Sequence, residues 1–343
     1  MLERPSITDE RITDEVYNLY GVTVANVSFL PWGYDLHTAA FKVEGLDGTA
    51  FFLKLRKGDF NPITVKIPQL LSQTGVKGII PVLPTRDDTL WCQLDGYTLI
   101  LYPYIAGKDG YHISLTEHQW TELGKLLRAI HTISIPAELI RQIPAEKYDP
   151  QWRETVMQLM ELVNHNDFQD SFARKLSIFI KKKAEAIYGI VKRANELVVA
   201  LSKHPRDFVL CHADAHPGNY HITGEGKVYL VDWDNLILAP KEHDLMCIGA
   251  GMSGDQPDGP EEKSFYQGYG MVKIDWQALT YYRYERIIQD IAEFGKQLLL
   301  TTGGGDGREQ SYQYFVGSFL PGEVVEVAFQ TDREHITRPV DKE

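Results

Sequence analysis

Apolar residues in the first hundred positions follow a pattern that is typical of strands. The segments 24–30, 38–45 and 49–55 are rich in β-branched and aromatic residues, and the short turn Leu46-Asp47-Gly48 joins the last two. Two further apolar runs, at 78–83 and 96–105, bring the expected strands to five, with a helix predicted at 64–74. We therefore expect a small antiparallel β lobe at the N-terminus.

Helical spacing of apolar residues replaces this pattern after Gly107. Thr116 followed by Gln119 predicts a capping box at the start of a helix that runs to about residue 133. Longer helices are predicted at 172–202 and 279–300, and short strands at 208–211, 220–223 and 227–231. The pattern thus predicts an α+β protein with three parts: an N-terminal β lobe (1–103), a hinge (104–107) and a helical C-terminal lobe (108–343).

Charge and composition exclude several partners. The 343-residue chain has a formal net charge of -12 and no run of basic residues, which argues against a nucleic-acid partner. An acidic protein favours cationic small molecules, although solubility alone also explains the charge. The longest apolar stretch, 97–106, is too short to cross a bilayer, so no membrane partner is expected. Three distant cysteines and an acidic N-terminus favour a cytoplasmic location.

The segment 209–235 holds the densest group of chemically active residues in the sequence. One hypothesis is a metal hydrolase, because His212, Asp214 and His216 alternate and would share one face of a strand. Against it, Pro217 and Gly218 interrupt a strand at once, and further ligands would be needed. A second hypothesis is a polar turn between two buried strands, with the histidines packed in the core.

The third hypothesis is phosphoryl transfer. The pattern His-x-Asp-x-x-x-x-Asn is present as His212, Asp214 and Asn219, and Asp232 closes the apolar strand that follows. Such a loop needs one carboxylate to accept the proton of an attacking hydroxyl and oxygen ligands to hold Mg²⁺. The joint spacing of these residues favours this hypothesis over the other two.

The stretches CHADAHPGN and VYLVDWDN together resemble the signature of the aminoglycoside phosphotransferase family. Further segments, among them LILYPYIAG, LGKLLRAIH, PKEHDLMCIG and YYRYERIIQDIAEFG, resemble its spectinomycin phosphotransferase branch in order and spacing. The resemblance implies a bilobal protein-kinase-like fold. It also implies an enzyme that transfers the γ-phosphoryl group of ATP or GTP to a hydroxyl of an aminocyclitol such as spectinomycin, with Mg²⁺ as cofactor.

The resemblance also implies roles for single residues. Asp214 would be the catalytic carboxylate, Asn219 and Asp232 would hold Mg²⁺, and His212 and Asp244 would support the loop. The other implied residues all bind the nucleotide: Lys54 and Gly33 at the phosphates, and the backbone of Pro103, Tyr104 and Ile105 at the adenine.

Two departures from the family pattern concern the nucleotide. The family supplies a glutamate on the helix after the lysine, but Pro62 stands in its place here, and Asp59 is the only acidic residue between Lys54 and Asp87. No G-x-G-x-x-G is present, and Gly33 is the one glycine in the expected phosphate-covering turn. Because of these departures, a second function stays open: a protein that binds nucleotide without catalysing phosphoryl transfer.

A hydroxylated, cationic acceptor would meet carboxylates of the helical lobe. The candidate substrate residues are Asp234, Glu242, Tyr284, Glu285 and Gln289. A solvated helix face is the alternative for each acidic residue, and a metabolic kinase of choline, homoserine or a sugar is the alternative function. The sequence leaves the oligomeric state open.

Overall fold

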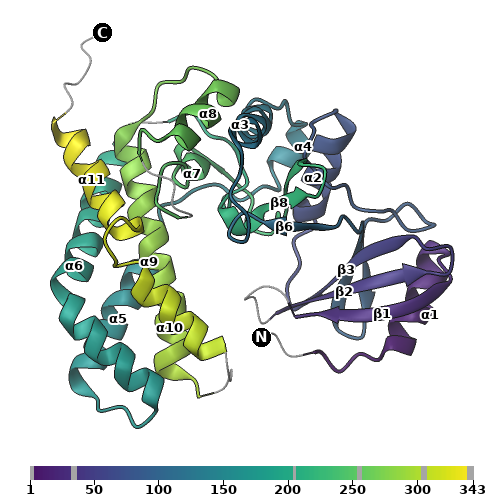
Figure 1. Cartoon of the computed structure of the whole chain (residues 1–343), viewed down its shortest axis with the longest axis horizontal. Helices are drawn as coiled ribbons and strands as arrows, with labels where there is room; N and C mark the ends of the chain where they lie inside the picture. The colour runs from purple at the N-terminus through teal and green to yellow at the C-terminus, as the bar shows by residue number, and fades with distance from the viewer. Residues whose placement is uncertain (1–3, 32–36, 204–205, 253–256, 303–306, 338–343) are drawn as a thin grey trace. The chain divides into compact units, whose positions relative to one another are not determined.

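The computed structural model describes residues 4–31, 37–203, 206–252, 257–302 and 307–337 (Figure 1). The chain forms two compact units whose segments interleave along the sequence. The first unit contains residues 1–113, 133–143 and 218–236, and the second contains 114–132, 144–217 and 237–343. The predicted division at a hinge (104–107) stays a prediction; among the two units described here, the segment 218–236 is grouped with the N-terminal residues.

An antiparallel five-stranded sheet forms the body of the first unit, in the order β1-β2-β3-β5-β4. Helix α1 (Asp9–Tyr20) places Ile12 and Val16 against one face of this sheet, in a core with Phe41, Leu53 and Leu101. The strand bounds are Val24–Leu30 (β1), Thr38–Gly45 (β2), Ala50–Lys57 (β3), Cys92–Leu94 (β4) and Tyr97–Pro103 (β5).

The opposite face of the sheet carries a smaller core and the candidate lysine. Helix α2 (Ile63–Gln73) contributes Val65 to this core, which also contains Val82 and Ile100. Side chains alternate between the faces of a strand, and Lys54 is the register partner of Ile100. Lys54 therefore lies on the α2 face, away from the α1 core.

A second, three-stranded sheet explains why 218–236 joins the first unit. Strands β8 (Tyr220–Thr223) and β9 (Val228–Leu230) form a hairpin, and β6 (Gly107–Asp109) pairs with β8. In addition, the backbone N–H of Leu230 donates to the carbonyl of Gly78. Helix α4 (Ala137–Ile140) belongs to the same unit.

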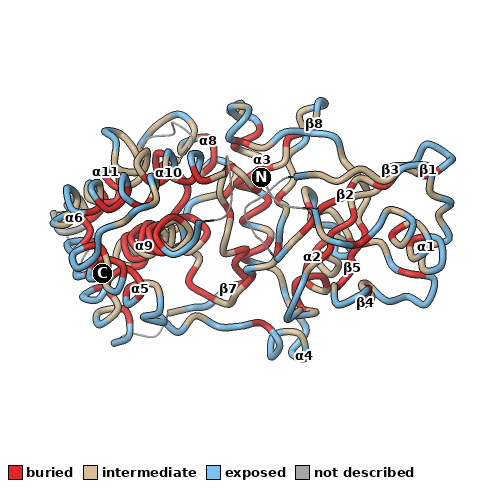
Figure 2. Tube along the Cα trace, turned by 90° about the horizontal axis from the view of Figure 1, so that it is seen from below, coloured by how far each residue is buried: buried red, intermediate tan, exposed pale blue. Residues whose placement is uncertain are grey.

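Helices dominate the second unit. The longest are α6 (Ser171–Leu201) and α9 (Trp276–Leu300), and α5, α10 and α11 also pack on α9. Figure 2 shows the buried character of α9, whose apolar residues include Ile287, Ile288 and Ile291. The remaining elements are α3 (Glu117–His131), α5 (Gln151–His165), β7 (Val209–Cys211), β10 (Ile237–Ala239), α7 (Glu242–Leu245), α8 (Pro260–Tyr269), α10 (Gly307–Gly317) and α11 (Val324–Thr337). The 3-10 turn Pro217–Asn219 spans the boundary between the units.

The predicted fold class is confirmed, with an antiparallel sheet in the N-terminal region and helices in the C-terminal region. The predicted capping box is present, because Thr116 and Gln119 bond reciprocally at the start of α3. The predicted strand at 78–83 is wrong. Pro81 lacks an N–H, and only Leu83 bonds to the sheet, through the carbonyl of Leu101. The fifth strand is β4, which the sequence pattern did not indicate.

Two glycines allow α3 and α8 to pack with their backbones in contact. A Cβ at Gly268 would lie 1.9 Å from the carbonyl oxygen of Thr121, and one at Gly124 would lie 2.1 Å from that of Phe265. Because the obstructing atoms are backbone, neither side could yield by changing a rotamer. The approach of these helices therefore requires glycine at both positions.

We expect Gly268→Ala to lower the free energy of unfolding by about 1–3 kcal/mol, through overpacking of the α3–α8 contact. Gly189→Ala is the matched control, because Gly189 is an exposed α6 residue whose added Cβ meets nothing within 4 Å. It should stabilise the protein by about 0.5–1 kcal/mol, since alanine is the better helix former. Urea unfolding measures both; a neutral Gly268→Ala would contradict the proposed packing.

Candidate active site

The loop that follows β7 is held by one buried carboxylate. Asp244 accepts the backbone N–H of His212 (2.8 Å) through Oδ2 and that of Ala213 (2.7 Å) through Oδ1. Ala213 has a φ of 67°, a left-handed conformation that costs a non-glycine residue about 1–3 kcal/mol. Below the loop, the fully buried His212 accepts the backbone N–H of Asp214 at Nδ1 (3.3 Å). The loop conformation is thus set by hydrogen bonds to its own backbone.

Asp244 is in turn held by residues that the sequence analysis did not single out. His131, at the end of α3, is hydrogen-bonded to Asp244 Oδ2 through Nε2 (3.0 Å) and to the hydroxyl of Tyr269 through Nδ1 (2.8 Å). Burial raises the pKa of Asp244, but its contacts with His131 and nearby histidines outweigh this effect and hold the pKa below its ordinary value. The one signal for His131 in the sequence is a polar residue on the buried face of an amphipathic helix.

Asp214 projects from this loop, and its carboxylate contacts two basic side chains. Its Oδ1 accepts from Nη1 of Arg286 on α9 (2.6 Å) and lies 3.4 Å from Nε2 of His216. Burial opposes ionisation, yet the hydrogen bond from His216 and the charge of Arg286 hold the pKa of Asp214 well below its usual range. Asp214 is therefore ionised at neutral pH.

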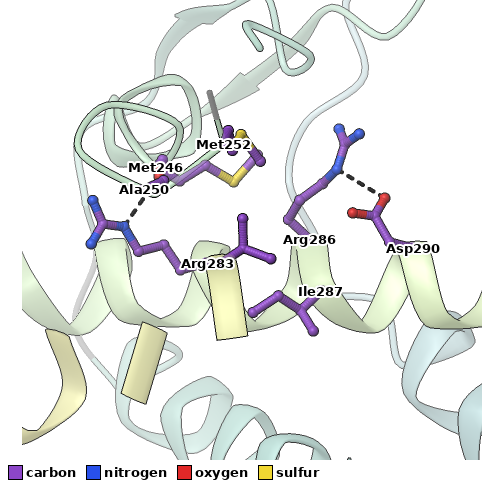
Figure 3. A pocket seen from close by; sticks show the side chains of 8 residues that line it. Met246, Ala250, Met252, Arg283, Arg286, Ile287 and Asp290 are labelled. Atoms are coloured by element: carbon purple, nitrogen blue, oxygen red, sulfur yellow. Dashed lines mark hydrogen bonds and ion pairs between the residues drawn. The ribbon is translucent and has the colours of Figure 1, made fainter. Parts of the chain in front are cut away.

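Arg286 also bonds Asp290, so one guanidinium joins two carboxylates. Nε of Arg286 donates to Asp290 Oδ1 (3.1 Å), one turn further along α9 (Figure 3). Both residues line a small cavity, which Met246, Met252 and Ile287 also border. Burial raises the pKa of Asp290, while the charge of Arg286 opposes that shift. The sequence pattern does not predict that Arg286 joins Asp290 to Asp214, since an Arg and an Asp at helical spacing look like a surface pair.

The predicted substrate residues have other partners in the structure. The buried Glu242 accepts the backbone N–H of Asp275 (2.9 Å) and pairs with Lys241 (2.8 Å). Tyr284 is buried and donates to Asp332. Glu285 pairs with Arg153 (2.6 Å), and Gln289 donates to Glu293 (2.9 Å). Asp234 belongs to the first unit. Of the five, only Gln289 bonds the carboxylate of Glu293, which interacts electrostatically with Asp290, Arg286 and Asp214.

In the first unit, Lys54 is bonded to two carboxylates of the segment Asp-Trp-Asp. Its Nζ lies 2.9 Å from Asp232 Oδ1 and 2.9 Å from Asp234 Oδ2, and Arg56 also bonds Asp234 Oδ2. Burial opposes the charge of Lys54, but the two aspartates outweigh it and raise the pKa above its ordinary value. We call Lys54, Arg56, Asp232 and Asp234 the lysine cluster.

The hairpin brings Asn219 and Asp232 to adjoining strand ends. The N–H of Val231 donates to the carbonyl of Asn219 (3.0 Å), directly beyond the β8–β9 ladder. Asp232 then turns out of the strand with a φ of 64°, and its side chain is 51% exposed. As metal ligands, the side chains of Asn219 and Asp232 offer oxygen atoms, which Mg²⁺ prefers, so these residues fit the predicted metal.

Two backbone groups of the hinge already have hydrogen-bond partners within the protein. The N–H of Tyr104 donates to the carbonyl of Ala50 (3.0 Å), and the carbonyl of Ile105 accepts from His221 Nε2 (2.9 Å). Adenine recognition by Pro103, Tyr104 and Ile105 stays a prediction. It would use the remaining backbone N–H and C=O groups of these residues. Gly33 lies outside the described residues.

The strand required by the metal-hydrolase hypothesis is not found. Strand β7 ends at Cys211, and residues 212–216 belong to the loop described above, so His212, Asp214 and His216 do not share a strand face. The imidazole of His212 lies beneath the loop, with Nδ1 occupied by the backbone of Asp214.

A family model described as "Phosphotransferase enzyme family" matches residues 62–282, well over half of the chain. The chain belongs to this family. The match covers the Asp214 loop, Asp244 and the β8–β9 hairpin, while Lys54 precedes it. The phosphotransferase shows no match among curated proteins compared by sequence.

Solved structures extend the similarity over almost the whole chain. Spectinomycin phosphotransferase APH(9)-Ia in complex with ADP and spectinomycin is 34% identical, with a TM-score of 0.89, covering 96% of this chain and 100% of that one. Its AMP-bound complex is also 34% identical, with a TM-score of 0.84 and coverage of 95% and 99%. Amicoumacin kinase hAmiN in complex with AMP-PNP, Ca²⁺ and Ami shares the fold at 14% identity, with a TM-score of 0.60 and coverage of 92% and 95%.

The predicted family and protein-kinase-like fold are thereby confirmed. The phosphotransferase acts on a small molecule and uses a nucleotide, which is the enzyme class that the sequence predicts. Within its described residues, no helix combines the length and the apolar character that a membrane crossing requires.

Arg286→Met should move the acidic limb of the activity profile to higher pH. In the wild type Asp214 stays ionised at pH values well below its ordinary pKa. Loss of the Arg286 charge raises the pKa of Asp214, so its protonation begins at higher pH. Arg286→Lys keeps the charge and should shift the limb less. Initial rates across pH measure the effect, and superimposable limbs in wild type and Arg286→Met would refute it.

Arg153→Met should destabilise the protein by about 3–5 kcal/mol, because it leaves Glu285 buried without its cation. Burial raises the pKa of Glu285 to about 7, against the charge of Arg153. A raised carboxyl pKa means that stability falls as pH rises through it, so the loss should be larger above pH 7 than below. Urea unfolding at several pH values tests this.

Lys125→Met is the control for Arg153→Met, because Lys125 forms an exposed pair with Glu122. Its effect should stay within about 0.5 kcal/mol. If Glu285 were a substrate ligand rather than a structural partner, Glu285→Gln would raise the KM of the acceptor while leaving the unfolding free energy nearly unchanged.

Proposed function

We propose that this phosphotransferase moves the γ-phosphoryl group of ATP to a hydroxyl of an aminocyclitol such as spectinomycin, with Mg²⁺ as cofactor. The observation that carries the proposal is the 34% identity to a spectinomycin phosphotransferase over almost the whole of both chains. The ionised carboxylate of Asp214, on a loop fixed by Asp244, supplies the chemical group that the reaction needs.

Asp214 would orient the acceptor hydroxyl and accept its proton as the new O–P bond forms. A carboxylate with a strongly lowered pKa is a weak base, so its main contribution is position and charge, as is usual for phosphoryl transfer. Arg286 now bonds the carboxylate oxygen that would face a hydroxyl or an ammonium group. We expect the acceptor to compete with this guanidinium, which keeps Asp290 as its second partner.

The lysine cluster and the hairpin would hold the donor. Lys54 would contact the phosphates, while Asn219 and Asp232 would hold Mg²⁺. The metal, when bound, neutralises phosphate charge and so stabilises the negative charge of the transition state. The phosphate and metal contacts named here do not involve the base, so they would serve GTP as well as ATP.

Carboxylates near Asp214 fit an acceptor that carries amines. Burial raises the pKa of Glu293, as it does that of Asp290, and a cation placed beside them would favour their ionised forms. Gln289 lies beside Glu293 and is the most suitable of the predicted substrate residues. A cationic acceptor, and with it a role in antibiotic resistance in the cytoplasm, forms part of the proposal.

The decisive measurement is nucleotide turnover across spectinomycin, other aminocyclitols, choline, homoserine and sugars, with ATP and GTP in parallel. We expect Mg²⁺-dependent turnover with spectinomycin that EDTA abolishes, and a loss of at least about 10³-fold in Asp214→Asn, whose amide cannot accept the proton. Nucleotide affinity should be retained in that variant. Turnover with a metabolite but not with spectinomycin would overturn the assigned acceptor and favour a metabolic kinase.

A further inference from the structure

Two cations of β3 lie on the same face of the sheet and share one oxygen atom. Lys54 and Arg56 are two residues apart on β3, so their side chains leave the strand on the same side. Both bond Oδ2 of Asp234. Two positive groups held this close need a negative partner between them, and Asp234 provides it.

Helix α2 supplies no such partner. In this fold position the family resemblance implies a glutamate, but the α2 sequence ITVKIPQLLSQ contains no acidic residue, and Pro62 precedes its first turn. The carboxylates bonded to Lys54 come instead from the turn after β9. Trp233, between the two aspartates, is buried and donates from Nε1 to the carbonyl of Leu230 (3.1 Å), which fixes the turn.

The two aspartates differ in their surroundings. The side chain of Asp232 is 51% exposed and is the predicted metal ligand, whereas that of Asp234 is 19% exposed and enclosed by both cations. Once Asp232 serves a metal, Asp234 alone faces Lys54 and Arg56. One positive charge is then in excess, and a polyphosphate can neutralise it.

We propose that Arg56 is a second phosphate-binding cation beside Lys54, and that Asp234 is the positioning residue that holds both, in place of the missing helix carboxylate. The side chain of Arg56 is 27% exposed, which leaves it accessible to a ligand. Its planar fork suits the paired oxygens of a diphosphate or triphosphate. This inference rests on the proposed function in one respect, the use of a nucleoside triphosphate as donor.

The test is calorimetric binding of AMP, ADP and ATP, with and without Mg²⁺, to the full chain in the absence of any acceptor. Arg56→Gln should weaken ADP and ATP binding by about tenfold or more, the usual size of one charged hydrogen bond, and AMP binding by clearly less. Lys57→Gln is the matched control: it removes a positive charge from the next residue of β3, which is exposed and faces the other side. Equal losses for the two variants would overturn the role of Arg56.

A double-mutant cycle tests Asp234. Asp234→Asn should weaken ADP binding severalfold, because both cations lose their fixed position, and the loss should shrink in the Arg56→Gln background. Asp234→Glu keeps the charge and should recover part of the affinity. Unchanged or tighter ADP binding by Asp234→Asn would show that the carboxylate only competes with phosphate, and would overturn the positioning role.

Two further outcomes separate this inference from the proposed function. If Arg56→Gln unfolds, Arg56→Lys keeps a charge without the fork and should bind ADP with intermediate affinity; full affinity would overturn the role of the fork. If the wild type binds nucleotide but turns over no acceptor in the panel, only the proposed acceptor would be contradicted, and the nucleotide-binding role of Arg56 would stand. A wild type that binds no nucleotide would overturn both proposals.

Discussion

The hydrogen bonds between Asp244 and the backbone of His212 and Ala213 are the constraint on which the catalytic loop depends. A carboxylate that is 1% exposed would be costly to bury without partners, and here two backbone N–H groups and His131 satisfy it. These bonds offset the strain of the left-handed Ala213. Asp214 follows directly, so this buried network sets its backbone position, while Arg286 and His216 contact its carboxylate.

The charges of the two units follow a common arrangement. In each unit a cation bonds a pair of carboxylates: Arg286 bonds Asp214 and Asp290, and Lys54 bonds Asp232 and Asp234. Each arrangement holds two carboxylates in a fixed position beside a positive charge. A substrate that binds there can replace one charged partner by another, which avoids leaving a charge without a partner.

Prediction from sequence succeeded where the pattern is local. The spans of β1, β2 and α9 follow from period-two and helical spacing, and the capping box at Thr116 follows from a four-residue signal. It failed at residues 78–83, where Ile79 and Val82 are buried but no strand ladder forms, because proline interrupts the hydrogen bonds. Strand β4 was missed because three residues carry too little periodicity.

By itself the sequence determined the family and the group of candidate residues, because the spacing of His212, Asp214, Asn219 and Asp232 is fixed along the chain. Only the tertiary structure decided which charges meet. Arg286 reaches Asp214 from α9, and Asp234 replaces a helix glutamate as the partner of Lys54, across 72 and 180 residues respectively. Ion pairs between such distant residues leave no local pattern, since any acidic or basic side chain on a helix or turn looks solvated until the chain has folded.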